Sequence, residues 1–168
     1  MGCGKSSVGR RIALMTGHRF VDTDELIVQR EGRSITDIFA SDGEGTFRAI
    51  EQAVIEDLIG VAGIVLATGG GAVLQEVNRA ALHKIGVFVW LHADPDVLFE
   101  RASRSNRRPL LQTENPRATF DALLASRIPI YETAADFQVD STGLSHDETA
   151  KRIVDGVARF HAFAKPAH

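Results

Sequence analysis

Four short apolar runs alternate with longer helix-like stretches, and this alternation constrains the fold more than any other feature of the chain. The runs are Arg19–Asp22, Ile64–Thr68, Val87–His92 and Phe137–Asp140. Stretches typical of helices are Lys5–Thr16, Asp24–Arg30, Ile35–Ala40, Gly45–Ile59, Val77–Ile85, Pro95–Ser103, Pro116–Glu132 and His146–Phe163. Strands that alternate with helices form a parallel sheet covered on both faces. The sequence therefore predicts one α/β domain over 1–163, followed by a tail, 164–168, that we expect to be disordered.

The composition fits one globular domain and excludes several other classes of protein. The chain has 168 residues, of which 44% are hydrophobic and 24% are charged, as is usual for soluble domains. Its net charge of −3 gives no basic field for nucleic acid, and one cysteine cannot form an internal disulfide. No apolar run approaches a membrane span. We expect a cytoplasmic monomer that binds neither nucleic acid nor a membrane.

The segment Gly2-Cys3-Gly4-Lys5-Ser6-Ser7 matches the end of a phosphate-binding loop, whose full pattern is Gly, four residues, then Gly-Lys-Ser/Thr. In such a loop the backbone N–H groups surround the phosphates, and the following helix points its positive end at them. Lys5 is then expected to reach the β- and γ-phosphates, and Ser6 to bind Mg²⁺. Cys3 needs no redox role as a small residue within the loop. The segment predicts a nucleotide site.

A strand normally precedes such a loop, and here the first Gly of the pattern and one further residue would lie before Met1. We expect Met1 to be an internal methionine of a longer natural chain. Without the strand, we expect the protein to be unstable, to bind nucleotide poorly, or both, since a buried strand contributes several apolar side chains and backbone hydrogen bonds.

Two further groups of residues lie where a parallel sheet gathers its ligands, beyond the carboxyl ends of its strands, and one further pair lies in a predicted helix. Asp22-Thr23-Asp24 follows the first run; next to a triphosphate, one carboxylate can help to hold Mg²⁺ and the other can face an acceptor hydroxyl, although such a triplet also caps helices. Gly69-Gly70-Gly71 follows the second run and would let a ligand contact bare backbone. Arg48 has Glu51 at i+3, so the two can brace each other or form an ordinary surface pair.

Arginines also border a segment with few apolar residues, Ser105–Asn115, which we interpret as a lid over about 105–115. They are Arg101, Arg104, Arg107 and Arg108, with Pro109-Leu110-Leu111 behind them. Such a charge run is usually a solvated surface. At the border of a lid, an arginine can instead meet a phosphoryl group as its charge develops.

Together these motifs resemble those of shikimate kinases along nearly the whole chain. The matching residues are Gly2-Cys3-Gly4-Lys5-Ser6-Ser7, Asp22-Thr23-Asp24, Gly32-Arg33-Ser34-Ile35, Ile38-Phe39, Asp42-Gly43-Glu44, Phe47-Arg48, Glu51, Ala67-Thr68-Gly69-Gly70-Gly71, Arg108-Pro109-Leu110-Leu111, Arg127 and Tyr131. The order and spacing of several separated motifs make the resemblance specific. It implies a P-loop kinase-like three-layer sandwich with strand order 2-3-1-4-5. The strand missing before Met1 would be the first and central one, so the sheet should split between Ile64–Thr68 and Val87–His92.

The resemblance also implies the reaction and the role of each site residue. The reaction is transfer of the ATP γ-phosphoryl group, with Mg²⁺, to the 3-hydroxyl of shikimate, a step towards chorismate and the aromatic amino acids. The catalytic residues would be Lys5, Asp24 as base, and Arg108 on the lid. Shikimate would contact Asp24, Arg48, Gly69, Gly70, Gly71 and Arg127, with Glu51 orienting Arg48. The nucleotide would contact Gly2, Cys3, Gly4, Lys5, Ser6, Ser7, Arg101 and Arg108, and Mg²⁺ would lie beside Ser6 and Asp22.

Three other functions stay open at this point. Another small-molecule P-loop kinase, such as one acting on gluconate, would share the loop but not the combination of Arg48, Arg127 and the three glycines. A nucleoside monophosphate kinase is a more distant alternative of the same class. A kinase-like domain that binds a small acid without catalysis is the alternative from a different class.

Overall fold

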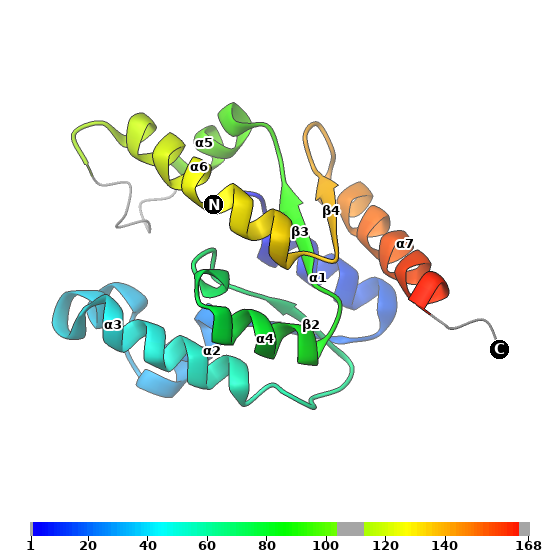
Figure 1. The fold of residues 1–168 in the computed structure, drawn as a ribbon, viewed down its shortest axis with the longest axis horizontal. Coiled ribbons are helices and arrows are strands. Elements are labelled where there is room, and N and C mark those ends of the chain that lie inside the picture. The colour runs from blue at the N-terminus through cyan, green and yellow to red at the C-terminus, as the bar shows by residue number, and fades with distance from the viewer. Residues whose placement is uncertain (1, 104–112, 165–168) are drawn as a thin grey trace.

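Helices and strands alternate along the chain in the order that the sequence predicts (Figure 1). The structure, a computed structural model, describes residues 2–103 and 113–164. Its elements are α1 (Lys5–Thr16), β1 (Arg19–Asp22), α2 (Thr23–Glu31), α3 (Ile35–Glu56), β2 (Ile64–Ala67), the 3₁₀ turn η1 (Ala72–Leu74), α4 (Glu76–Ile85), β3 (Val89–His92), α5 (Pro95–Ser103), α6 (Pro116–Ala134), β4 (Phe137–Asp140) and α7 (His146–Ala164). This is the predicted α/β architecture.

The four strands in the described part of the chain form two separate parallel pairs. β1 pairs with β2 from Arg19 opposite Ile64 to Asp22 opposite Ala67. β3 pairs with β4 from Val89 opposite Phe137 to His92 opposite Asp140. No pairing joins β2 to β3 among the described residues. The split predicted between these two strands is thus observed, and β1-β2 and β3-β4 are strands 2-3 and 4-5 of the expected order.

Helix α1 connects the two halves of the molecule, because it contacts β1, β2 and α7. It begins after Gly4, whose φ of 80° is left-handed, and it ends before Gly17, which is left-handed too. At its second turn, a Cβ on Gly9 would lie 2.6 Å from the ring of Phe20 in β1. The helix can therefore approach the strand only with a glycine at this position.

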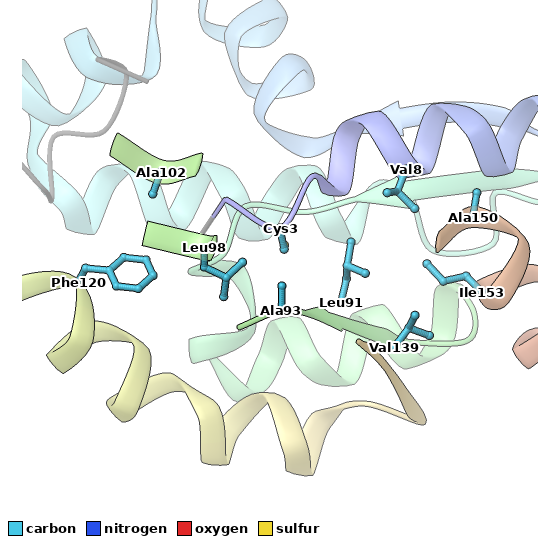
Figure 2. Packing of buried hydrophobic residues seen from close by; sticks show 10 residues of the cluster. All are labelled: Cys3, Val8, Leu91, Ala93, Leu98, Ala102, Phe120, Val139, Ala150 and Ile153. Atoms are coloured by element: carbon cyan, nitrogen blue, oxygen red, sulfur yellow. The ribbon is translucent and has the colours of Figure 1, made fainter. Parts of the chain in front are cut away.

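Within the described residues, the buried apolar side chains form three clusters. The largest gathers Val8 of α1 with residues of β3, α5, α6, β4 and α7, and the completely buried Phe120 lies at one end of it (Figure 2). A second lies between α3, η1 and α4 around Ile55 and Val73. A third joins α2 to α3 through Ile27, Ile38 and Phe47. In Figure 1, β2 lies with α2, α3 and α4, and β3 lies with α5, α6 and α7.

Some boundaries differ from the sequence prediction. The helices predicted over Ile35–Ala40 and Gly45–Ile59 form one segment, α3, with a kink at Gly43 (φ 79°, ψ 173°) that only glycine adopts readily. The turn η1 was not predicted, because three residues give no periodicity. Strand β3 begins at Val89 instead of Val87, and α6 continues to Ala134.

The predicted helix starts at Ser34 and Asp94 are confirmed by side-chain caps. The Ser34 hydroxyl accepts from the Asp37 amide in a capping box, and the Asp94 carboxylate accepts from the Asp96 amide at 2.8 Å. Most of the predicted lid, 104–112, and residues 165–168 of the predicted tail lie outside the described residues. Over the described part of the chain, no helix has both the length and the apolar character needed to span a membrane.

Candidate active site

The phosphate-binding loop has the backbone that its glycines predict. Gly2 and Gly4 both have positive φ angles, 77° and 80°. A Cβ on Gly2 would lie 2.6 Å from the carbonyl oxygen of Leu98 in α5, so the loop runs directly against that helix. Helix α1 begins at Lys5, immediately after the loop, and its first N–H groups have no carbonyl partner within the helix. The loop therefore offers amide groups and a helix N-terminus, which together suit an anion.

Cys3 anchors the loop to the core below it. Its side chain is buried and points towards Leu91 and Ala93 (Figure 2). Burial acts to raise the pKa of the Cys3 thiol, but the charge of Lys5 and the backbone N–H groups outweigh burial, so the pKa lies below its usual value. The Lys5 ammonium is 3.8 Å from the Cys3 sulfur. The positive field that lowers this pKa is the field that a bound phosphate would meet.

A single carboxylate, that of Asp22, links the loop to the residues after β1. One of its oxygens accepts from the Ser6 hydroxyl at 2.7 Å, and the other accepts from the Asp24 amide at 3.0 Å. The two predicted Mg²⁺ residues, Ser6 and Asp22, are therefore in contact. The same hydrogen bonds fix Asp24, the predicted base, relative to the loop.

The first glycine after β2, Gly69, lies close to two carboxylates that are predicted to belong to the site, those of Asp24 and Glu51. A Cβ on Gly69 would lie 3.0 Å from an oxygen of Asp24 and 3.1 Å from an oxygen of Glu51. The Gly69 amide itself donates to the Thr23 hydroxyl at 3.2 Å. Two carboxylates thus flank a bare stretch of backbone, which leaves room for a ligand only because no side chain projects from it.

Arginines lie against the next two glycines. Arg48 donates to Glu51 at 2.7 Å and to Glu44 at 3.0 Å, and its guanidinium would lie 2.5 Å from a Cβ on Gly71. On the other side, Arg127 of α6 lies 3.8 Å from the corresponding position on Gly70. The Tyr131 hydroxyl, one turn further along α6, donates to the Gly70 carbonyl at 2.6 Å. Two guanidinium groups from different helices therefore face one backbone segment, an arrangement suited to a carboxylate ligand.

Burial shifts the titration of the carboxylates in this pocket. The pKa of Asp24 is raised, first by burial and then by the charge of Asp22, and Lys5 and Arg48 offset only part of the rise. The pKa of Glu51 is raised by burial as well, although its hydrogen bond with Arg48 acts in the opposite direction. Burial acts to lower the pKa of Arg48, but its bonds to Glu51 and Glu44 more than compensate, and the pKa is raised. The carboxylate of Asp24 therefore takes up a proton at a higher pH than that of an ordinary aspartate, a change of the kind found at functional sites.

One oxygen of Glu51 has no hydrogen-bond partner among the described residues, although the side chain is only 1% exposed. A buried acceptor without a partner is costly, so such groups usually bind a ligand or water. This is the oxygen that lies beside Gly69. It is available to accept a hydrogen bond from a ligand hydroxyl in the pocket.

The described residues that were predicted to bind the nucleotide lie next to those predicted to bind shikimate. Arg101, at the end of α5, lies beside the loop, because its Cβ would be 3.5 Å from a Cβ on Gly2. Arg108 lies outside the described residues. Ser6 and Asp22 provide hard oxygen donors of the kind that Mg²⁺ prefers beside phosphate oxygens and waters, so this pair fits that ion. Within residues 2–103 and 113–164, no group of three or more His, Cys, Asp or Glu side chains is placed to hold a metal by itself.

Two residues make contacts at the site that no pattern in the sequence predicted. Thr23 was noted only as part of its triplet, but its hydroxyl holds the Gly69 amide. His146, the first residue of α7, has a ring nitrogen 3.3 Å from the position of a Cβ on Gly4. Its distance in sequence from the loop hides this contact, which only the packing of α1 on α7 creates.

The contact between Gly71 and Arg48 makes a testable prediction. We expect Gly71→Ala to displace the Arg48 guanidinium, since the added methyl would overlap it, and therefore to weaken binding of a carboxylate ligand by about tenfold or more. Isothermal titration with the ligand would measure this loss. Gly45→Ala is the matched control, because a Cβ there contacts nothing within 4 Å and the backbone is helical. Equal affinities for the two variants would contradict the arrangement.

Comparisons with known proteins agree on one family. The family model described as "Shikimate kinase" matches residues 1–158. A shikimate kinase of Halorhodospira halophila is 45% identical over 157 residues, which cover 94% of this chain and 89% of that protein. One from Actinobacillus pleuropneumoniae serotype 5b is 43% identical over 155 residues, with coverages of 92% and 90%.

Solved structures give the same result. The shikimate kinase of Acinetobacter baumannii in complex with shikimate superposes with a TM-score of 0.90 at 36% identity, covering 95% of this chain and 89% of the other. That of Aquifex aeolicus gives a TM-score of 0.81 at 30% identity, with coverages of 98% and 95%. With a family model matching almost the whole chain and close relatives aligned over most of their length, this protein belongs to the shikimate kinase family.

Proposed function

We propose that this protein transfers the γ-phosphoryl group of ATP to the 3-hydroxyl of shikimate, giving shikimate 3-phosphate on the route to chorismate. The observation that carries the proposal is the convergence of Asp24, Arg48 and Arg127 on Gly69–Gly71, beside a phosphate-binding loop. The family supports a kinase that uses a nucleotide. We place it in the cytoplasm as a monomer.

In this proposal, the acceptor pocket holds shikimate by its carboxylate and its hydroxyls. Arg48 and Arg127 bind the planar carboxylate, because a guanidinium can donate two parallel hydrogen bonds to it. Asp24 faces the reacting hydroxyl and accepts its proton as the bond to phosphorus forms. Glu51 keeps Arg48 in place through the 2.7 Å bond and offers its second oxygen to a ligand hydroxyl. The pocket therefore binds both the carboxylate and the hydroxyls of a small hydroxylated acid.

The nucleotide half-site acts mainly through charge and position, since phosphoryl transfer needs little covalent help. Residues Gly2 to Ser7 surround the phosphates, and the Lys5 ammonium stabilises the charge that develops on the transferring group. Arg101 lies at the side of the loop and would contact the adenine. Arg108 would meet the phosphates from the lid. Mg²⁺, held by Ser6 with support from Asp22, would neutralise part of the phosphate charge when bound.

The proposed function is tested by measuring ADP release with ATP, Mg²⁺ and one acceptor at a time. We expect turnover with shikimate but not with gluconate or with nucleoside monophosphates. Calorimetric titration of shikimate and ATP on the same sample separates catalysis from binding alone. Binding of both ligands without turnover would instead identify a non-catalytic sensor, and turnover with gluconate alone would identify a different small-molecule kinase.

Replacing Arg48 with alanine should change both the affinity for shikimate and the stability of the fold. We expect Arg48→Ala to raise the KM for shikimate by about ten- to a hundredfold, because a charge-assisted bond to the carboxylate is lost, with a smaller effect on kcat. The same change leaves Glu51, which is 1% exposed, without its partner, and should cost about 3–5 kcal/mol of stability.

The double variant Arg48→Ala/Glu51→Gln tests the two effects independently. A neutral amide removes the unpaired buried charge, so we expect thermal stability to recover while the KM for shikimate stays high. Steady-state kinetics and calorimetric melting measure these quantities. Recovery of both together would mean that Arg48 affects shikimate only through folding, and an unchanged KM in the single variant would remove it from the shikimate site.

A further inference from the structure

The glycine turn that follows β2, Gly69–Leu74, has a hydrogen-bond donor for every one of its backbone carbonyl groups. Two of these bonds are internal: the Ala72 amide donates to the Gly69 carbonyl at 3.2 Å, and the Leu74 amide donates to the Gly71 carbonyl at 3.0 Å. The other donors are side chains of α4 and α6. Because three successive glycines have little conformational preference of their own, these outside donors decide which way the peptide groups of the turn face.

Helix α6 supplies the donor for Gly70. The Tyr131 hydroxyl donates to the Gly70 carbonyl at 2.6 Å, and the Tyr131 ring packs near Trp90 of β3, with 5.9 Å between the ring centroids. The carbonyl of Gly70 and the N–H of Gly71 belong to one planar trans peptide group, so they point in opposite directions. By holding the carbonyl, Tyr131 therefore directs the Gly71 amide away from α6.

Helix α4 supplies the donors for the second half of the glycine turn. The side-chain amide of Asn78 donates to the Ala72 carbonyl at 2.9 Å, and the Arg79 guanidinium donates to the next two carbonyls at 2.8 and 3.3 Å. Ala72 directly follows the three glycines, and its own amide holds the Gly69 carbonyl. Asn78 therefore fixes the residue on which the orientation of the first glycine depends.

Packing alone does not explain an asparagine at position 78. The side chain is completely buried, and its oxygen has no hydrogen-bond partner among the described residues. Asn78 lies one turn before Ala81 and Leu82 on α4, which belong to an apolar cluster. A buried polar atom without a partner is costly, and an apolar side chain of similar size would avoid that cost. The half of the side chain that does make a bond is the half that holds the glycine turn.

These bonds leave the amides of Gly70 and Gly71 without an acceptor in the described part of the chain. Arg48 lies against Gly71 and Arg127 lies against Gly70, so a guanidinium group accompanies each of these glycines. A carboxylate is attracted by N–H groups and repelled by carbonyl oxygens. A turn whose carbonyls are all held by donors, and whose amides are not used, is therefore suited to a carboxylate.

We propose that Tyr131 and Asn78 are positioning residues for the acid substrate. They hold the glycine turn so that the amides of Gly70 and Gly71 face the carboxylate of the bound acid. Both side chains act through the backbone, so they affect the binding of the acid more than the transfer of the phosphoryl group. That the acid is shikimate rests on the proposed function.

The first test is Tyr131→Phe, which removes the hydroxyl and keeps the ring. We expect both the Kd for shikimate, from calorimetry, and the KM for shikimate to rise by about five- to tenfold, with kcat changed by less than about twofold. Thr133→Val is the matched control, because it removes a hydroxyl that donates to the Pro129 carbonyl on the exposed side of the same helix. A lower melting temperature of Tyr131→Phe with unchanged Kd and KM would show a purely structural role and overturn the proposal for Tyr131.

The second test is Asn78→Leu, which removes the donor to Ala72 and keeps the approximate size of the side chain. We expect the KM for shikimate to rise by a similar factor, while the KM for ATP stays within about twofold of that of the unchanged protein. An equal rise in both KM values, or no rise in either, would overturn the role of Asn78. If Asn78→Leu does not fold, Tyr131→Phe still decides whether the glycine turn is held for the acid.

The third test observes the amides of the turn directly, by NMR of protein labelled with ¹⁵N-glycine. We expect shikimate to shift the signals of Gly70 and Gly71 but not that of Gly45, whose surroundings are open. Saturable binding without a shift at Gly70 or Gly71 would overturn the inference and leave the proposed function in place. Binding with both shifts but without turnover would overturn the proposed function and leave the inference in place. Absence of shikimate binding would overturn both.

Discussion

Replacing Lys5 with alanine should lower kcat by about 10²–10³-fold at saturating ATP and shikimate. Lys5 is the first residue of α1, directly after the loop. Its charge acts to lower the pKa of Cys3 and the pKa of Asp24. An ammonium in this position stabilises the phosphoryl group most strongly as charge develops during transfer. ADP release at saturating substrates measures the effect, and calorimetry shows whether ATP still binds.

The matched control is Lys151→Ala, because Lys151 is exposed and pairs with Asp155 on α7, at 2.9 Å. It should retain full turnover. Lys5→Ala makes a second, independent change: without the ammonium that lowers it, the pKa of Asp24 should rise further, and the acid limb of the pH–rate profile should move to higher pH. If turnover survives in Lys5→Ala and the limb does not move, Lys5 does not face the reacting groups.

The fold could be predicted closely because its signals are local. Apolar runs gave the four strands, and capping residues such as Ser34 and Asp94 gave helix starts, since a cap depends on atoms within a few residues. The kink at Gly43 and the turn η1 could not be predicted, because they depend on how α3 and the chain after β2 pack. The gap between the strand pairs was expected only through the resemblance to a family with a central strand.

The site could be predicted by residue but not by geometry. Spacing along the chain singled out Asp24, Arg48 and Gly69–Gly71, whereas Arg127 was indicated only by the resemblance. No pattern could show that the Asp22 carboxylate bonds to Ser6 and to the Asp24 amide at the same time, because that contact spans the loop and β1. Nor could it show that the His146 ring lies next to Gly4, because these residues come together only when α1 packs against α7.

Replacing Asp24 with asparagine should lower kcat by about 10²–10⁴-fold, the contribution typical of a positioned base. The amide keeps the size of the side chain but cannot accept the proton of the shikimate hydroxyl. Because burial and the charge of Asp22 raise the pKa of Asp24, the activity of the unchanged protein should fall on acidification at a higher pH than an ordinary aspartate would give. A pH profile of kcat/KM measures that limb, which should be absent from the residual activity of Asp24→Asn.

In Asp24→Asn, the stability of the fold should stay the same or rise while the activity falls. This difference distinguishes a catalytic role of Asp24 from a structural one. A carboxyl group whose pKa is raised by folding contributes stability below its unfolded pKa, and this contribution is lost as pH rises through the folded pKa. At pH 8, ionised Asp24 therefore costs stability, and Asp24→Asn should melt at the same temperature or higher. Asp155→Asn, on the exposed face of α7, controls for the loss of one negative charge. A clear drop in melting temperature together with lost turnover would show instead that the Asp24 carboxylate holds the fold, and that the loss of activity reports on unfolding.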